Sequence, residues 1–402
     1  MKGSAASPHP ENQTSDGTDC KYDAESIFVL TFLEAVRKRP EMYVGDTDDG
    51  SGLHNMVDMV VVDNAVEEAV AGYATRIEVV VNANHSVTVR DDGRGIPVEA
   101  DERKGVSRAE LLMTDPLGGR NPWLGGCALA NALSSRLRLT AWRDGREHVV
   151  EFADGETVGP LHVVGDAGGR RGTELTFLAS REIFRNVEYD FETLEGRLRE
   201  LAFLNSTVTI VLSDRRQAAG RRVEMHYPGG VTEFVRYLDR DRKEIVPNPI
   251  TLCSELSGIR VEAALWWNDS CNENVLCFID NRLQCGGDSF AGLRTALNTA
   301  LTRQVNGYAR VNGDDRTDAR KADVVNERLR LTQEDCCAGL TAVLSIMVKW
   351  SSVRGKVSRC LRKVFNASLA SWFKEHPTEA GIIVGKVMEA AALRKAAAVE
   401  RL

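Results

Sequence analysis

The chain has 402 residues, a hydrophobic fraction of 43% and a formal net charge of −7, which together predict two or three domains with large cores. The negative charge gives the chain as a whole no electrostatic means of wrapping DNA. With neither an apolar signal core nor a run near ~18 apolar residues, we expect a cytoplasmic protein without a membrane partner. The nine cysteines show no Cys-x-x-Cys spacing, so we expect reduced thiols rather than disulfides or a zinc site.

The first 19 residues are rich in Ser, Gly, Asn, Pro and acidic residues, a composition that predicts a disordered tail. The segment 22–27 follows and carries two apolar residues, Tyr22 and Ile27. On its residues alone, this segment reads as an ordinary continuation of the tail.

Residues 54–72 predict a helix, because apolar residues recur at three- and four-residue spacing and Gly72 supplies a C-terminal stop. Residues 77–81 and 86–90 predict two strands, since both are β-branched and bounded by turn formers. The second strand runs directly into residues 91–97, Asp-Asp-Gly-Arg-Gly-Ile-Pro.

Polar residues in this stretch point to a nucleotide. Asn64 and Glu68 lie one helical turn apart, so they project from the same face. An amide and a carboxylate facing a sheet are costly unless something satisfies them, and Mg²⁺ suits such oxygen ligands. Asp91, at a strand end, can accept a hydrogen bond from an exocyclic amine such as that of adenine, and Arg94 is placed to pair with Glu68. The two glycines beside Arg94 let the backbone approach a ligand closely.

The rest of the chain continues as helices and strands separated by turns. The expected elements are a short helix at 105–114 with Ser107 near its start, a helix at 127–134, turns at 143–145 and 153–155, and a strand at 172–177. The polar and basic stretch 214–222 is a plausible domain boundary. Beyond it we expect a strand at 259–266, a helix near 289–307 and a long helix from about 377. Basic clusters at 169–171 and 354–363 are most simply solvated surface.

These segments together resemble the ATPase region of the DNA gyrase B protein and its topoisomerase IV relatives. The resemblance covers roughly residues 22–400 and rests on the stretch 53–97 and on Leu33–Gly50, Leu198–Ser206, Trp267–Asp269 and Val384–Val387. It implies an α+β fold, with a Bergerat-type α/β-sandwich ATP-binding domain followed by an α+β transducer domain that reports the nucleotide state. We therefore expect a tail at 1–19, an ATPase domain with an N-terminal arm at 20–222 and a transducer at 223–402.

The resemblance also assigns residues to the nucleotide. Asn64 takes the position of the magnesium ligand, and Thr173 that of a threonine that supports adenine through water. Tyr22 and Ile27 take the positions of arm residues that close over the nucleotide of the neighbouring protomer. The nucleotide-binding residues implied in this way are Tyr22, Ile27, Asn64, Glu68, Asp91, Gly93, Arg94, Gly95, Ile96, Pro97, Gly119, Gly125, Gly126 and Thr173.

Three departures from the family pattern bear on hydrolysis, and the first concerns the general base. In the family, a glutamate one helical turn before the asparagine activates the attacking water. Counting back from Asn64 places Val60 at this position. Counting forward from residues 56–57 places Met59 there, because this chain carries one extra residue before Asp63. Neither side chain can take a proton, so we assign no catalytic residue.

The neighbouring positions offer only a weak substitute for the base. The family histidine that orients the base corresponds here to Asn55 or Met56. Asp58 is the one nearby carboxylate, but it lies six residues before Asn64. That spacing corresponds to about 240° around an ideal helix, so we expect Asp58 to face elsewhere.

The second and third departures concern contacts with the phosphates. The family's lid is abbreviated to residues 115–126, roughly ten residues short, and its Gly-x-x-Gly-x-Gly is reduced to Gly125-Gly126. Two amide positions that face phosphate are therefore in doubt. The transducer's Gln-Thr-Lys switch, whose lysine reaches the γ-phosphate in the family, aligns with 353–355. Arg354 in this stretch, or Lys356 one position after it, is the available substitute.

The sequence thus predicts the ATP-binding and transducer region of an ATP-dependent type II DNA topoisomerase that hydrolyses poorly, with ATP and Mg²⁺ as cofactors. The family's DNA-cleavage domains do not occur in this sequence, so we expect DNA to be engaged only through a topoisomerase complex. The alternative is a non-enzymatic paralogue that forms a homodimer through the arm, or a heterodimer with an intact gyrase B that it modulates. A mismatch-repair ATPase of the same superfamily is disfavoured by the transducer motifs and by Arg-Lys-Arg-Pro at 37–40.

Overall fold

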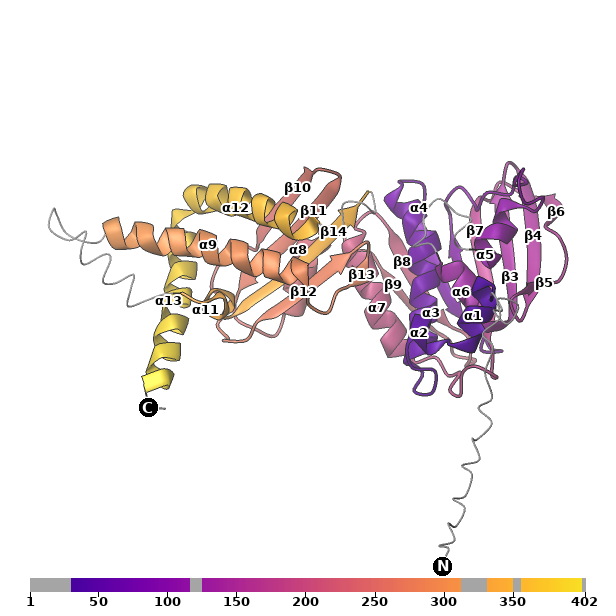
Figure 1. Ribbon diagram of the computed structural model, residues 1–402, viewed down its shortest axis with the longest axis horizontal. Helices are drawn as coiled ribbons and strands as arrows, with labels where there is room; N and C mark the ends of the chain where they lie inside the picture. Colours follow the sequence, from indigo (N-terminus) through magenta and orange to yellow (C-terminus); the bar gives the residue numbers. More distant parts are fainter. Residues whose placement is uncertain (1–29, 116–124, 312–330, 350–355, 400–402) are drawn as a thin grey trace, which may run out of the picture.

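The computed structural model describes residues 30–115, 125–311, 331–349 and 356–399. These residues form two bodies joined side by side, the N-terminal one indigo to magenta and the C-terminal one orange to yellow (Figure 1). Each body has its own mixed sheet, its own packed helices and its own apolar core, which confirms the α+β class expected from the sequence. Among the described helices, none is long and apolar enough to cross a membrane.

The described N-terminal residues build a nine-stranded sheet in the order β5-β4-β3-β7-β2-β1-β8-β9, with β6 paired to β4. Strands β1 and β8 run parallel, and the other neighbours are antiparallel. The strands are β1 (Arg76–Val81), β2 (Val87–Asp91), β3 (Ser134–Arg143), β4 (Arg146–Ala153), β5 (Glu156–Thr157), β6 (His162–Asp166), β7 (Gly172–Ala179), β8 (Thr209–Asp214) and β9 (Arg221–Met225).

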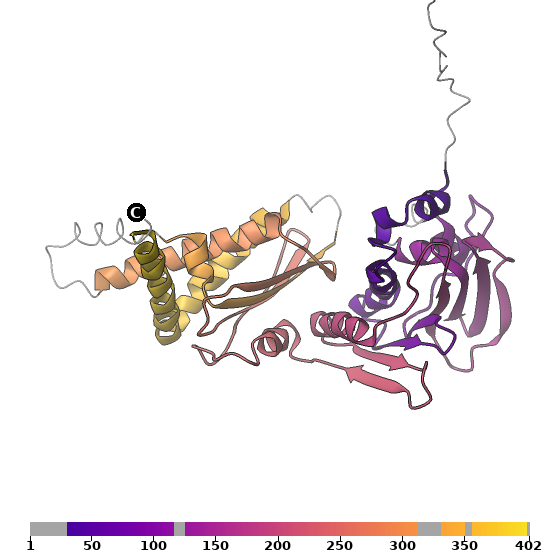
Figure 2. The same cartoon turned by 90° about the horizontal axis from the view of Figure 1, so that it is seen from below.

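Helices cover one face of this sheet (Figures 1 and 2). In β2, Val87, Val89 and Asp91 are buried, while Thr88 and Arg90 between them are partly exposed, as expected for a strand with one covered face. The helices are α1 (Phe32–Lys38), α2 (Glu41–Val44), α3 (Ser51–Val60), α4 (Glu67–Val70), α5 (Arg108–Thr114), α6 (Gly126–Ala132) and α7 (Phe191–Leu204).

The helix predicted at 54–72 is present but not uniform. Helix α3 ends at Val60, a π-helix (η2, Val61–Val66) follows, and α4 ends shortly before Gly72, whose φ is 81°. A π-helical turn holds more residues than an α-helical turn, because each hydrogen bond spans five residues rather than four. The π-helix therefore accommodates the extra residue before Asp63, which left two counting frames open in the sequence.

Two other predicted helices are found, one with a correction. Ser107 caps α5: its Oγ accepts a hydrogen bond from the Glu110 N–H at 3.1 Å, and the Glu110 carboxylate accepts from the Ser107 N–H at 2.9 Å. The helix predicted at 127–134 ends at Ala132, because Ser134 already begins β3.

The stretch 214–222, where we expected a domain boundary, lies within one hairpin of the first sheet. It connects β8 to β9, which pair in one antiparallel hairpin of the first sheet. Its charges are satisfied within the same body, for example between Arg216 and Asp214 at 2.7 Å. The boundary expected at 222/223 falls within β9, and we propose that the boundary lies after Met225.

The C-terminal body has a five-stranded sheet in the order β10-β11-β14-β12-β13, with helices on both faces. Side chains of β14 alternate: Ala342 and Leu344 pack with α9 and α12, whereas Val343 packs with α8 on the other face. The elements are α8 (Gly230–Leu238), β10 (Ile250–Leu256), β11 (Ile259–Trp267), β12 (Asn274–Ile279), β13 (Arg282–Leu283), α9 (Asp288–Val311), α11 (Gln333–Cys337), β14 (Leu340–Val348), α12 (Val357–Glu375) and α13 (Pro377–Val399).

Candidate nucleotide-binding site

Asp91 ends β2 and lies at the centre of a buried polar group that we call the Asp91 cluster (Asn64, Asp91, Ile96 and Thr173). Asp91 is 1% exposed, and its Oδ2 accepts a hydrogen bond from Asn64 Nδ2 of η2 at 3.2 Å. Thr173, near the start of β7, accepts the Ile96 N–H through its Oγ1 at 3.0 Å. The π-helix, two adjacent strands and the loop after β2 therefore converge on one site.

Arg94 pairs with Glu68, as the sequence predicted. Arg94 Nη2 donates to Glu68 Oε1 at 2.7 Å, and Arg94 Nε donates to Oε2 at 3.1 Å. The backbone N–H of Arg94 also donates to Oε2, at 2.9 Å, and the guanidinium lies 3.8 Å from the centre of the Tyr73 ring. This two-pronged pair fixes the loop after Asp91 on α4.

The glycines of this loop are required by close contacts within the protein. A Cβ at Gly93 would lie 2.8 Å from Asp91 Oδ1 and 2.9 Å from Glu68 Cβ. Gly95 has a φ of 82°, and its carbonyl accepts a hydrogen bond from Arg143 Nη1 at 2.8 Å. Close packing of chain on chain and a left-handed backbone thus account for both glycines before any ligand is considered.

The oxygen atoms of the Asp91 cluster suit both an amine, which donates hydrogen bonds, and Mg²⁺, which binds oxygen ligands. Burial raises the pKa of Asp91 to about 7, although the N–H groups of Gly93 and Thr173 donate to it. Asn64 directs its Nδ2 to Asp91, so within the described residues its carbonyl oxygen remains available for Mg²⁺. No group of three or more His, Cys, Asp or Glu side chains able to hold a metal occurs in the described parts of the chain. A magnesium ion at Asn64 would therefore need phosphate oxygens and water to complete its ligands.

The position one turn before Asn64 is apolar in either counting frame. Val60 is fully buried in the core, and Met59 packs partly buried against it. Asn64 lies within the π-helix that begins directly after Val60, so Met59 and Val60 are both close to one turn before it. Neither frame brings a proton acceptor to this position.

Asp58 is bound on another side of the helix. Its Oδ1 accepts a hydrogen bond from Arg197 Nε of α7 at 2.8 Å. Arg197 also donates to Glu200 at 2.8 Å and to the Asn281 carbonyl of the C-terminal body at 2.6 Å. The carboxylate is thus paired with a partly buried arginine at the contact between the two bodies.

Gly126, the first residue of α6, donates its N–H to Asp63 Oδ2 at 2.8 Å, and Asp63 Oδ1 pairs with Arg282 of β13. We call these three residues the Asp63 junction. Gly126 is one of the two lid glycines that the resemblance assigns to the phosphates, and here its N–H is engaged by a carboxylate of the protein. The sequence did not predict this contact, since Asp63 and Arg282 are 219 positions apart. The one available signal was an acidic residue directly before Asn64.

Several predicted site residues cannot be placed. Tyr22, Ile27, Gly119 and Arg354 lie outside the described residues. Of the others, Gly125 directly precedes α6, and Lys356 is exposed directly before α12.

Comparisons with known proteins agree with the resemblance. The DNA gyrase B family matches residues 230–401. The DNA gyrase B protein of Caulobacter vibrioides is 42% identical over 96% of this chain and 50% of its own length, so the chain spans about half the length of the curated relatives it matches. The 43K ATPase domain of Thermus thermophilus gyrase B, solved with an aminocoumarin, is 30% identical with a TM-score of 0.75, covering 92% of this chain and 97% of that one. The topoisomerase IV ATP-binding domain of Francisella tularensis, 24% identical with a TM-score of 0.72, covers 91% and 98% and shows the same fold.

The similarity runs through both bodies and includes a solved domain that this chain covers almost completely. The chain therefore belongs to the DNA gyrase B family, and it corresponds to the ATPase and transducer region of that family.

Proposed function

We propose that this chain binds ATP through the Asp91 cluster as the nucleotide-dependent part of a type II DNA topoisomerase, and that it hydrolyses ATP slowly. Asp91 supplies a buried acceptor for the adenine amine, Thr173 supports the same side of the site, and Asn64 offers an oxygen to Mg²⁺. Bound ATP would supply the phosphoanhydride whose cleavage drives the family's reaction. The residues of this chain hold and orient the nucleotide.

The observation that carries the slow-hydrolysis proposal is the apolar pair one turn before Asn64. Val60 is fully buried, Met59 is a thioether, and the nearby carboxylate of Asp58 is held by Arg197. A positioned general base typically contributes a factor of about 10²–10⁴ to a rate, so its replacement by an apolar side chain removes a factor of that order.

Calorimetric titration with ATP and with ADP tests the binding proposal. We expect weak and similar affinities for the two nucleotides, because the lid is short and the Gly126 N–H already bonds to Asp63. The γ-phosphate then adds little binding free energy. An affinity for ATP far above that for ADP would show that the phosphate side of the site is intact, and it would overturn this part of the proposal.

A second function is supported by the same hydrogen bonds within the protein, those of the Gly126 N–H to Asp63 and of Asp58 to Arg197. A chain that binds nucleotide but turns it over slowly can act as a non-enzymatic partner of an intact gyrase B, with DNA reached only through that complex. Mixing the purified chain with an intact gyrase and measuring supercoiling distinguishes the two functions. Dose-dependent inhibition or activation supports the modulator, whereas no effect together with measurable ATP turnover supports the ATPase.

A further inference from the structure

The contact between the two bodies includes a bonded turn. Strands β12 and β13 are joined by Asp280 and Asn281, which both have positive φ (48° and 63°), as expected for a tight two-residue hairpin turn. Asn281 is only 4% exposed, because it lies against the N-terminal body. Its carbonyl accepts from Arg197 Nη2 at 2.6 Å, and its Oδ1 accepts from Asn205 Nδ2 at 3.0 Å.

The next residue of the same hairpin reaches the helical segment α3–η2–α4 that carries Asn64, which we call the nucleotide helix. Arg282 pairs with Asp63, whose side chain is 5% exposed. The other oxygen of Asp63 accepts the Gly126 N–H, and the next residue along η2 is Asn64 of the Asp91 cluster. One buried carboxylate is thus bonded both to the first residue of α6 and to a hairpin of the transducer.

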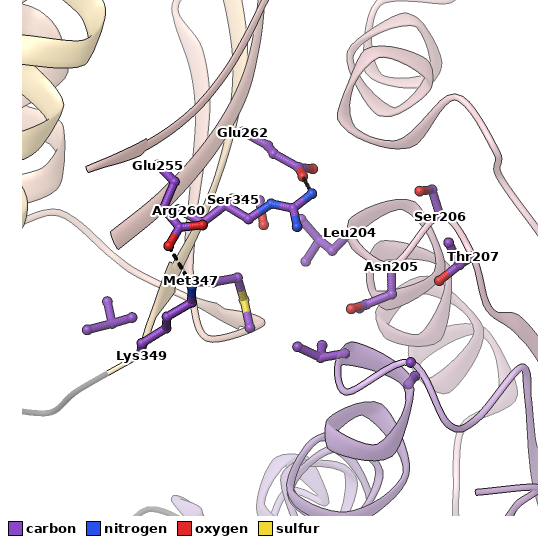
Figure 3. A pocket seen from close by; sticks show the side chains of 14 residues that line it. Leu204, Asn205, Ser206, Thr207, Glu255, Arg260, Glu262, Ser345, Met347 and Lys349 are labelled. Atoms are coloured by element: carbon purple, nitrogen blue, oxygen red, sulfur yellow. Dashed lines mark hydrogen bonds and ion pairs between the residues drawn. The ribbon is translucent and has the colours of Figure 1, made fainter. Parts of the chain in front are cut away.

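Away from this turn, the interface has an apolar part and a hollow part. Phe203 of α7 stacks on Phe234 of α8 with ring centres 4.7 Å apart, within a cluster that includes residues of the second sheet. Beside it lies a cleft of about 600 Å³ between the two bodies (Figure 3). The cleft is lined by Val70 and Asn205 on one side and by Arg260, Met347 and Lys349 on the other. Among the described residues, the N-terminal body thus bonds to the β12–β13 hairpin through Arg197 and Asn205 of α7 and through Asp63 of η2.

We propose that Asp63 is a positioning residue that ties the start of α6 and the β12–β13 turn to the nucleotide helix. Its two oxygens are shared between these elements, so a displacement of Arg282 releases the carboxylate from one side and changes its hold on Gly126. The transducer is thereby coupled to the segment that follows the lid through a side chain adjacent to Asn64. This inference goes beyond the proposed function, because the contacts exist in the chain without nucleotide.

Hydrogen exchange of the purified chain without nucleotide tests the junction directly. We expect Arg282→Met to speed exchange by at least about tenfold in two separate segments, η2 with α6 and the β12–β13 hairpin, because the charged hydrogen bond to the buried Asp63 carboxylate is lost between them. Arg260→Met is the matched control. Arg260 pairs with Glu262 inside the transducer, so its loss should speed exchange only around β10 and β11.

Two further variants keep the test decisive. If Arg282→Met does not fold, Arg282→Lys takes its place in the test. This variant retains the charge and should give the same two-segment pattern with a smaller amplitude. Asn281→Gly preserves the left-handed turn but removes the bond to Asn205, so it should affect the end of α7 and leave α6 unchanged. Faster exchange confined to the hairpin in the Arg282 variants, with η2 and α6 unchanged, would overturn the proposal. Because no nucleotide is used, this result is independent of whether ATP binds.

Discussion

The Asp91 cluster and the Asp63 junction lie on the same helical segment, one residue apart at Asn64 and Asp63, yet they differ in what their polar groups contact. In the Asp91 cluster, both Asp91 oxygens accept bonds from neutral N–H groups, those of Gly93 and Asn64, and burial raises the pKa of Asp91 to about 7. The Asn64 carbonyl oxygen is left available within the described residues. In the Asp63 junction, both carboxylate oxygens are taken, one by Gly126 and the other by Arg282.

The difference separates recognition from turnover. Buried polar groups that the protein does not fully satisfy are favourable partners for a ligand, because binding replaces a missing hydrogen bond. A carboxylate such as Asp91 has lone pairs left for a further donor, whereas the Gly126 N–H has one hydrogen and must leave Asp63 before it contacts a phosphate. We therefore expect the adenine side of this site to bind its ligand and the phosphate side to contribute little.

The largest expected effect concerns hydrolysis. With Val60 and Met59 at the base position, ATP turnover should lie about 10²–10⁴-fold below that of an intact gyrase ATPase in a phosphate-release assay with Mg²⁺. Met59→Glu introduces a carboxylate at the more accessible of the two positions and should raise turnover, whereas the matched variant Met59→Gln should not. Turnover comparable to an intact gyrase ATPase in the unmodified chain would contradict the prediction. In that case Asp58→Ala would show whether Asp58 is recruited despite its bond to Arg197.

The second effect concerns recognition. Asp91→Ala should weaken ATP binding about tenfold to a hundredfold or abolish it, because it removes the acceptor for the adenine amine and leaves Asn64 without its partner. Asp92→Ala is the control, since Asp92 bonds to Thr75 and to the Arg76 N–H on the other side of the strand. Calorimetry should show near-normal binding for this control. Equal losses of ATP affinity in the two variants would mean that binding depends on the loop after β2 rather than on the Asp91 carboxylate.

The third effect is a pH dependence of the same group. The pKa of Asp91 is raised from 3.8 to about 7 by burial, with Glu68 and Asp92 as neighbouring charges that add to the rise. The adenine amine needs the ionised carboxylate, so ATP affinity should increase with pH between about 6 and 8, by at most tenfold per unit. Titrations at several pH values measure this slope. Asp91→Asn should remove the slope, and a slope that survives this substitution would assign it to another group.

The free energy of unfolding should depend on pH in the opposite sense to ATP affinity: it should rise as the pH falls. A carboxyl whose pKa is higher in the folded state binds its proton more tightly there, so lowering the pH from about 7 towards 4 stabilises the fold. The limit for one group is about 1.4 kcal/mol per pH unit. Burial also raises the pKa of Asp63, to about 6, and so acts in the same direction. The difference between the unmodified chain and Asp91→Asn in urea unfolding therefore isolates the contribution of Asp91, and identical pH profiles would contradict it.

Local signals in the sequence were sufficient for most elements and for the Glu68–Arg94 pair, because both depend on short-range spacing. The π-helix at 61–66 was not predicted, although the extra residue before Asp63 was its visible sign. A domain boundary was predicted at 214–222 because a charged hairpin connection and the connection between two domains have similar compositions. The bonds of Asp63 to Arg282 and of Asp58 to Arg197 span 219 and 139 positions. Such pairings are set by how the two bodies pack, which local periodicity does not encode.

The smallest expected effect concerns self-association, which should not respond to nucleotide. A ligand shifts an equilibrium between monomer and closed dimer only if it binds the two states with different free energies. In this chain the Gly126 N–H is held by Asp63, and the base position is apolar, so few of the described phosphate-side groups can distinguish the two states. The arm residues Tyr22 and Ile27 lie outside the described residues, and any association that they support should not depend on ATP. Sedimentation measured with and without a non-hydrolysable ATP analogue should therefore give the same species. A monomer that dimerises only with the analogue would mean that phosphate contacts outweigh the Asp63–Gly126 bond, and the chain would then be a working nucleotide-operated clamp.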